Sequence, residues 1–275
     1  MKTLTGIVLF ASALAIPVAA RAGSITIKGS DTMVLLGQRW AEDYMANVPG
    51  ATIQVTGGGS GTGISALING TTDICQASRT MSEAEKNSLR EKYKTPGEEI
   101  PVARDGLSVY VNAANSVKEL NMEQLRLIFT GKVTNWKEVG GKDASIILYT
   151  RENSSGTYVF FKEHVLKNAD YAQRAQSMPG TAAVVNAVSK EKNGIGYGGA
   201  AYAKGIRVLK IKKDAESPGV EPNLANVQNG SYPLSRPLFF YLRNKAAGDI
   251  KAFVDWVLSP AGQEIVTKVG YFPVK

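Results

Sequence analysis

Residues 147–158 read Ile147-Leu148-Tyr149-Thr150-Arg151-Glu152-Asn153-Ser154-Ser155-Gly156-Thr157-Tyr158. This stretch joins an apolar run to an arginine and then to a turn of small hydroxyl residues. The pattern predicts a strand over 144–151, a loop, and a helix that ends at about residue 167. A helix start presents unpaired backbone N–H groups at the positive end of the helix dipole, and an arginine lies just upstream. The stretch therefore predicts a binding site for an oxyanion.

The same order of strand, small polar loop and helix start occurs three times before residue 95. Strands are predicted at 24–28, 52–55 and 73–75, and the loops after them are Gly29-Ser30-Asp31-Thr32, the glycine-rich 57–63 and Gln76-Ala77-Ser78-Arg79-Thr80. Loops that follow parallel strands gather at the carboxyl edge of an open α/β sheet, where ligands bind. If three loops belong to one domain and the fourth to another, a ligand between them is enclosed by hinge closure.

Strands alternate with helices along the whole chain, which predicts α/β layers with largely parallel sheets. The spacing favours two sheets. We assign domain I to residues 23–110 plus about 230–275, and domain II to about 111–229. Domain I is therefore predicted to be discontinuous in the sequence.

The first 22 residues have the pattern of a signal peptide. Lys2 precedes an apolar run from Leu4 to Val18, and Ala20-Arg21-Ala22 has the small-x-small form of a cleavage site. We predict cleavage after Ala22 and a periplasmic location, with an extracellular location as a further option and an uncleaved anchor as the alternative.

Composition narrows the classes of partner. Removing Lys2 and Arg21 with the first segment leaves 30 basic and 24 acidic residues, a net charge of +6. This charge suits an anionic small ligand, and no cluster of Lys and Arg interleaved with aromatics indicates a nucleic-acid partner. Cys75 and His164 are the only residues of their kinds. We expect a buried thiol, a structural histidine, no disulfide and no metal site.

Enzymatic motifs are weak or absent in the sequence. Gly61-Thr62-Gly63-Ile64-Ser65-Ala66 matches a loose dinucleotide pattern, but no Gly-Lys followed by Ser or Thr forms a nucleotide P-loop. A serine hydrolase would need a histidine paired with Ser60 or Ser155, and a phosphatase would need an Asp and His metal cluster. We therefore predict a binding protein without a cofactor rather than a catalyst.

Several motifs in one order resemble the periplasmic phosphate-binding proteins of Pst-type ABC importers, over nearly the whole mature chain. They are Gly29-Ser30-Asp31-Thr32, the Gly-Ser-Gly-Thr-Gly of 59–63, Thr130-Gly131-Lys132-Val133-Thr134-Asn135-Trp136, Arg151 with Ser155-Gly156-Thr157, and Ile195-Gly196-Tyr197. The resemblance implies a two-domain periplasmic-binding-protein fold of type II. It also implies a dehydrated inorganic phosphate in the cleft, and a monomer that delivers this ligand to a membrane ABC permease.

The resemblance also implies particular phosphate ligands on both sides of the cleft. Domain I would contribute from its loops and domain II from the stretch at 151–157. The implied ligands are Ser30, Thr32, the backbone N–H of Met33, Ser60, Ser78, Arg79, Arg151, Ser155, the backbone N–H of Gly156, and Thr157.

Arg79 departs from the well-known branch of this family, which has an aspartate after the serine of the third loop. That aspartate accepts a hydrogen bond from protonated phosphate and so rejects sulfate, which has no proton to give, whereas arginine has no acceptor. Either Arg79 adds charge to the cleft, in which case Asp31 or Asp105 must act as the acceptor, or it points to solvent. Open alternatives are a binder of sulfate or another tetrahedral oxyanion, and a secreted phosphate-related enzyme or adhesion protein on the same fold.

Overall fold

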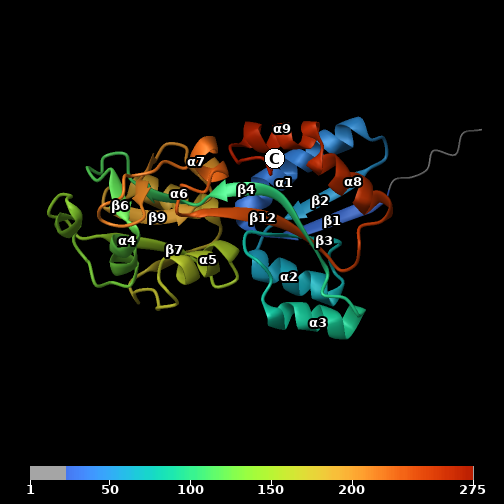
Figure 1. The fold of residues 1–275 in the computed structure, drawn as a ribbon, viewed down its shortest axis with the longest axis horizontal. Helices are drawn as coiled ribbons and strands as arrows, with labels where there is room; N and C mark the ends of the chain where they lie inside the picture. The colour runs from blue at the N-terminus through green and yellow to red at the C-terminus, as the bar shows by residue number, and fades with distance from the viewer. Residues whose placement is uncertain (1–22, 275) are drawn as a thin grey trace, which may run out of the picture.

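The computed structural model of the protein describes residues 23–274, so the predicted signal peptide lies outside the described residues. The described chain forms two domains, each built on a five-stranded sheet that is flanked by helices (Figure 1). The predicted α/β class and the two-sheet architecture are confirmed.

The sheet of domain I has the strand order β2-β1-β3-β12-β4. Helices α1, α8 and α9 cover one face and α2 and α3 the other (Figure 1). The elements of this domain are β1 (Ser24–Gly29), α1 (Asp31–Asn47), β2 (Thr52–Thr56), α2 (Ser60–Asn69), β3 (Ile74–Ala77), α3 (Glu83–Tyr93), β4 (Glu98–Gly106), β12 (Ser235–Leu242), α8 (Gly248–Leu258) and α9 (Pro260–Val269).

The sheet of domain II has the order β10-β5-β9-β7-β8, and a separate pair joins β11 to β6. Its elements are β5 (Ser108–Val111), β6 (Glu119–Asn121), α4 (Met122–Phe129), the 3-10 helix η1 (Trp136–Val139), β7 (Ile147–Arg151), α5 (Gly156–His164), β8 (Gln176–Met178), α6 (Thr181–Lys190), β9 (Gly194–Gly198), η2 (Ala200–Tyr202), β10 (Arg207–Val208), β11 (Lys210–Lys212) and α7 (Leu224–Gln228).

The prediction of largely parallel sheets was right for only part of each sheet. Strand β1 is parallel to β2 and β3, and β7 is parallel to β8 and β9. Strand β12, however, is antiparallel to both of its neighbours, as is β5 to β9 and β10. The physical reason is that β12 and β5 enter their sheets directly from the interdomain connections, without the crossover helix that a parallel pairing requires.

Helix starts in the sequence were mostly identified correctly. Ser82 followed by Glu85, and Asn121 followed by Gln124, are spaced in the sequence as capping boxes, and both boxes form at the starts of α3 and α4. Helix α9 was missed, although Ser259 caps it and Pro260 occupies its first turn. Helix α7 also lies within residues 212–229, where Pro218, Gly219 and Pro222 favour an irregular segment.

The two connections between the domains run side by side. Domain I leads into domain II at Leu107, between β4 and β5, and the chain returns just before β12. The backbone N–H of Leu107 donates to the carbonyl of Leu234 at 3.0 Å. The hydrogen bond joins the two connections into a two-segment hinge, so movement of one domain relative to the other would bend both connections together.

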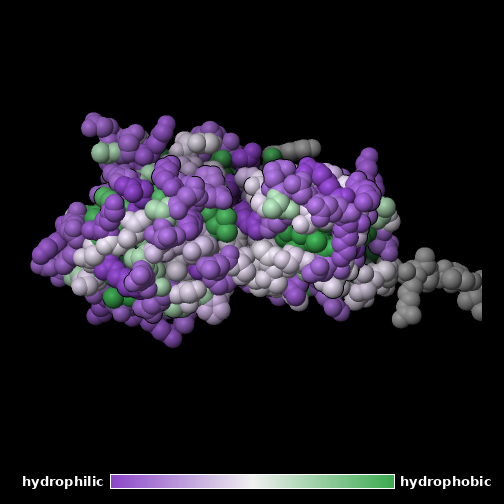
Figure 2. All heavy atoms as spheres, turned by 90° about the horizontal axis from the view of Figure 1, so that it is seen from below, coloured by the Kyte–Doolittle hydropathy of each residue, from purple (hydrophilic) through white to green (hydrophobic). Residues whose placement is uncertain are grey.

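Each domain buries its own apolar core. Trp40, Phe240 and Phe253 pack in domain I, and Phe129 and Phe161 pack in domain II. Figure 2 shows the surface of both halves, which is largely hydrophilic, and the waist between them. Among the described residues, no helix is both long enough and apolar enough to cross a membrane.

Candidate functional site

Four loops from the two domains meet at the waist, and their hydroxyl groups form one cluster. Thr32 Oγ1 of α1 lies 2.7 Å from Thr157 Oγ1 of α5, and Ser30 Oγ lies 2.9 Å from Ser78 Oγ. Ser78 Oγ is also 3.4 Å from Ser60 Oγ and 3.4 Å from Thr157 Oγ1. All five side chains are buried. We call Ser30, Thr32, Ser60, Ser78 and Thr157 the hydroxyl cluster.

Three helices begin at this cluster. Helices α1, α2 and α5 start at Asp31, Ser60 and Gly156, and no side chain caps the start of α1 or α2. The first N–H groups of a helix have no carbonyl four residues earlier within the helix to bind, and here the positive ends of three helix dipoles meet. This arrangement favours a small anion.

Gly156 allows the close approach of the two domains. A Cβ atom on this residue would lie 2.3 Å from Ser60 Oγ and 2.9 Å from Ser78 Oγ. The backbone at the start of α5 thus packs directly against hydroxyl groups of domain I.

Fixed N–H donors set the roles of three hydroxyl groups. Ser60 Oγ accepts from the backbone N–H of Ser78 at 3.0 Å, Ser155 Oγ from that of Tyr158 at 3.3 Å, and Thr157 Oγ1 from Arg236 Nη2 at 3.0 Å. An N–H group can only donate, so each hydroxyl keeps its own proton for another partner. The site therefore offers oriented O–H donors, which match an acceptor-rich guest.

Two of the predicted phosphate ligands, Ser155 and the backbone N–H of Met33, make hydrogen bonds within the first turns of their own helices. Ser155 is the N-cap of α5, and Tyr158 provides the N–H group that it accepts. The backbone N–H of Met33 donates to the carbonyl of Ser30 at 3.0 Å, so it closes the first turn of α1. Their predicted contacts with a ligand stay predictions.

Arg151 lies between carboxylates rather than among the hydroxyls. Its Nη2 donates to Asp31 Oδ2 at 2.9 Å, which links the two domains, and to Glu152 Oε1 at 2.7 Å. Its Nη1 donates to Thr181 Oγ1 at 2.9 Å. Burial raises the pKa of Glu152, but the hydrogen bond and charge of Arg151 outweigh burial and lower that pKa overall. The sequence predicted that the positive charge of Arg151 binds the ligand, but in the structure this charge is already paired with the carboxylates of Asp31 and Glu152.

Arg79 does not point to solvent, which was one of the two courses that the sequence left open, and it is paired with a carboxylate of its own domain. Its Nη1 and Nη2 form a bidentate pair with Glu85, at 2.8 and 2.7 Å. Its side chain is 14% exposed, so it does not point into solvent, and its Nε is buried without a partner. The physical reason is that Glu85 is the carboxylate of the capping box of α3, and its two oxygens match the guanidinium fork.

The sequence did not identify Arg236, which lies beneath the hydroxyl cluster. Its Nε and Nη2 donate to Asp105 Oδ2 at 3.0 and 2.8 Å, and both side chains are fully buried. The available signal was an arginine at the start of the apolar strand 236–242. Such a residue is buried only with a partner.

The charged groups around the cluster neutralise one another. Arg236 is paired with Asp105, and Arg151 with Asp31 and Glu152. Burial and the charge of Asp105 hold the pKa of Tyr271 well above its ordinary range, so its neutral phenol donates to the carbonyl of Thr32 at 2.5 Å. Anion binding here must therefore depend on hydroxyl groups and helix starts more than on net positive charge.

Cys75 and His164 lie outside the cluster. Cys75 is fully buried and burial raises the pKa of its thiol, as the sequence predicted for an inert cysteine. His164 stacks on Phe160, and its Nδ1 lies 3.0 Å from the carbonyl of that residue. Within residues 23–274, no group of three or more His, Cys, Asp and Glu side chains is arranged to hold a metal ion.

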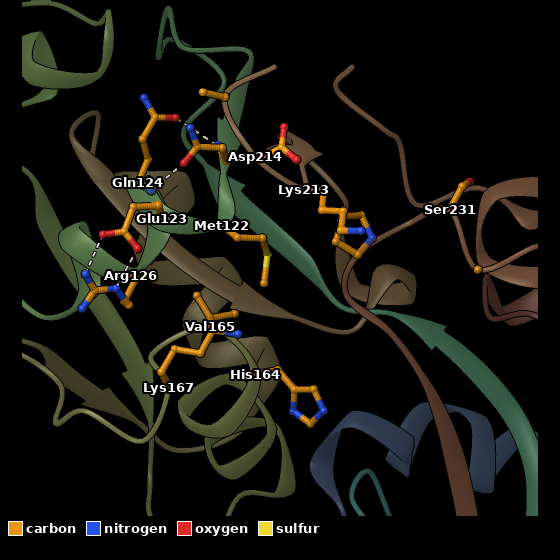
Figure 3. Close-up of a pocket in the computed structure, with 14 residues that line it drawn as sticks. Met122, Glu123, Gln124, Arg126, His164, Val165, Lys167, Lys213, Asp214 and Ser231 are labelled. Atoms are coloured by element: carbon orange, nitrogen blue, oxygen red, sulfur yellow. Dashed lines mark hydrogen bonds and ion pairs between the residues drawn. The ribbon is translucent and has the colours of Figure 1, made fainter. Parts of the chain in front are cut away.

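A hollow of about 780 Å³ lies on domain II and is distinct from the cluster (Figure 3). Met122 of α4, together with His164 and Val165 at the end of α5, lines it. Arg126 at its rim is bound to Glu123 on the same helix.

The fold and the site together define a two-domain solute-binding protein with an anion site between its domains. The PBP superfamily domain matches residues 16–261 of the chain. Phosphate-binding protein PstS of Pseudomonas aeruginosa is 36% identical over 269 residues, which cover 92% of this chain and 83% of that protein. PstS of Bacillus subtilis is 36% identical, with 92% of this chain and 81% of that protein covered.

A solved structure gives the same result. The crystal structure of a protein described as a phosphate ABC transporter substrate-binding protein from Clostridium perfringens, with bound phosphate, matches with a TM-score of 0.84 and 32% identity. The match covers 92% of this chain and all of that one. The chain belongs to the PstS family of phosphate-binding proteins.

Proposed function

We propose that the protein binds inorganic phosphate at the hydroxyl cluster and delivers it to a membrane ABC permease. The observation that carries this proposal is the convergence of oriented hydroxyl donors and three helix starts from both domains on one buried point. The names of its relatives, and the large share of both chains that each match covers, support the same function.

In this proposal the two domains have complementary roles. Thr32, Ser60 and Ser78 donate to the anion from domain I, while Thr157 and the backbone N–H of Gly156 donate from domain II. Ser30, Ser155 and the backbone N–H of Met33 complete the donor shell. We place the domain boundaries at the two interdomain connections, near residues 107 and 234.

We propose that the two arginines predicted from the sequence act around the shell. Arg151 holds the domains together through Asp31 and adds its field to the cleft. Arg79 secures the third loop through Glu85, and its buried Nε, which has no partner, is available to serve the site.

Isothermal titration calorimetry of the mature protein with inorganic phosphate tests the function directly. We expect heat and saturation at micromolar phosphate. No heat with phosphate at these concentrations would refute the proposal.

A second candidate ligand is sulfate or another tetrahedral oxyanion. The observation that favours it is the state of the nearby carboxylates. Asp31 accepts from Arg151 and the backbone N–H of Gly58, and Asp105 accepts from Arg236 and the backbone N–H of Ala200. A competition titration of phosphate against sulfate separates the two, because a site in which neither carboxylate accepts a hydrogen bond from protonated phosphate binds both.

We further propose that the protein acts as a binder rather than a catalyst, works as a monomer, and functions outside the cytoplasm after removal of residues 1–22. A phosphatase assay, sedimentation of the mature chain and N-terminal sequencing of the exported protein check these three points. Phosphate release from an aryl phosphate, a stable dimer, or a sequence that begins at Met1 would each contradict its point.

A further inference from the structure

Arg236 touches both domains at the floor of the hydroxyl cluster. From β12, its Nη1 donates to the carbonyl of Ser78 in domain I at 3.0 Å, and its Nη2 donates to Thr157 Oγ1 of domain II at 3.0 Å. Its side chain is 1% exposed. Neither contact is needed to neutralise Asp105, which already receives two hydrogen bonds from this arginine.

The surroundings fix the direction of this guanidinium. Asp105 Oδ2 accepts from Nε and Nη2, and Asp105 Oδ1 in turn accepts from the backbone N–H of Ala200 at 3.1 Å. The guanidinium carbon lies 5.2 Å from the centre of the Phe160 ring, on its face. A buried fork held at one end by a carboxylate and along its plane by an aromatic ring has little freedom to turn.

We infer that Arg236 is a positioning residue for the anion site and acts through Thr157; this inference rests on the proposed phosphate function. Guanidinium has five donors and no acceptor, so the oxygen of Thr157 must accept from it. The hydroxyl proton of Thr157 is then directed away from Arg236 and toward the cluster, where an anion accepts a hydrogen bond from it. Polarisation of the hydroxyl by the adjacent cation makes it a stronger donor.

A double-mutant cycle on phosphate affinity tests the inference. One arm is Thr157→Val, which keeps the shape and removes the hydroxyl. The other is Arg236→Met together with Asp105→Asn, which removes both buried charges and keeps an oxygen to accept from Ala200. We expect each arm to weaken phosphate binding roughly tenfold to a hundredfold, the effect of losing one hydrogen bond to a charged ligand.

The combined variant decides between positioning and a merely structural role. If Arg236 acts through Thr157, the variant carrying all three substitutions binds no more than about threefold more weakly than Thr157→Val alone, because the hydroxyl to be positioned is already gone. The inference is overturned if the loss of phosphate affinity in the combined variant equals the product of the losses in the two arms. Wild-type affinity in the Arg236→Met and Asp105→Asn arm also overturns it. Absence of binding by the wild-type protein would instead refute the proposed function.

Two further variants guard the interpretation. Arg243→Gln removes another arginine of domain I, which binds Asp73 and the carbonyl of Thr72 away from the cluster, and should leave affinity unchanged. If the neutralised pair fails to fold, Arg236→Lys takes its place, because an ammonium group retains the charge for Asp105 but lacks the fork that also reaches Thr157. A folded Arg236→Lys protein with wild-type affinity would equally overturn the inference.

Discussion

Replacing Gly156 with alanine should abolish tight phosphate binding while leaving both domains folded. The added methyl group would lie 2.3 Å from Ser60 Oγ, 2.9 Å from Ser60 Cβ and 2.9 Å from Ser78 Oγ. All three atoms belong to domain I, whereas Gly156 begins α5 of domain II. The methyl group therefore acts as a wedge between the domains and not as a clash within either one.

The size of the effect follows from these distances. Non-bonded heavy atoms pack at about 3.5 Å, so the two helix starts must separate by roughly 1 Å. Hydrogen bonds across the cleft of about 2.8 Å would then exceed the useful range. Losing two bonds to a charged ligand costs about 3 to 6 kcal/mol, or roughly a hundredfold and more in affinity.

Folding should be unaffected or improved by the same substitution. Gly156 is absent from the glycines with a left-handed backbone, so alanine fits its conformation. Alanine is favoured over glycine in helices by up to about 1 kcal/mol. Urea denaturation of the ligand-free variant should therefore give a free energy of unfolding equal to or above that of the wild type.

Gly61→Ala is the matched control, because it adds a methyl group at the same domain boundary. Its Cβ would lie 3.3 Å from the carbonyl oxygen of Ser154 and 3.6 Å from the Cα of that residue, contacts that a small shift relieves. We expect less than a tenfold change in phosphate affinity by calorimetry. Wild-type affinity in Gly156→Ala, together with a normal phosphate-induced decrease in radius of gyration by X-ray scattering, would refute the closed-cleft reasoning.

Three further perturbations probe other parts of the site. Ser155→Ala should lower the free energy of unfolding by about 1 kcal/mol, because the helix cap that accepts from the N–H of Tyr158 is lost. It should also weaken phosphate binding by roughly 1 to 3 kcal/mol. Urea denaturation measures the first loss and calorimetry the second, and unchanged values would contradict the assigned cap and site. Raising KCl from 0.05 to 0.5 M should change the dissociation constant for phosphate by less than about threefold, because the buried charges of the cleft are paired and screened little by salt; a steep loss of affinity would show an unpaired cation in the site. Glu85→Gln should destabilise the protein by about 1 kcal/mol at pH 7. Burial raises the pKa of the Glu85 carboxyl, but Arg79 outweighs burial and lowers that pKa in the folded state. The difference in free energy of unfolding between wild type and variant should therefore shrink as the pH falls below about 4.3, the ordinary pKa of a glutamate, and a difference independent of pH would contradict the ion pair.

Local features of the sequence predicted local features of the structure. The run from Ile147 to Tyr158 forms the strand, loop and helix start that its pattern indicated. Ser82 and Asn121 cap α3 and α4, as their spacing from Glu85 and Gln124 in the sequence indicates. These predictions succeeded because hydrophobic period and capping chemistry act over a few residues.

Long-range partners could not be predicted in the same way. Arg151 finds Asp31, which is 120 residues earlier, and Arg236 finds Asp105, which is 131 residues earlier. An arginine near a predicted anion site looks like a ligand until the carboxylates that the fold brings beside it are known. The direction of β12 depends likewise on its entry from the interdomain connection, which no local pattern records.

The division of the donors between two domains links binding to closure. A contact such as that between Thr32 and Thr157 replaces hydrogen bonds that the open protein makes with water. Each such contact therefore contributes only about 1 kcal/mol to holding the domains together. An anion that accepts several O–H and N–H donors at once binds only the arrangement in which both domains supply them, and it shifts the population toward closure by its differential affinity. Because the nearby cations are already paired, this differential affinity comes from geometry, and geometry is lost when the domains separate by roughly 1 Å. A permease can then distinguish loaded from empty protein by the relative position of the two domains, without contacting the buried ligand.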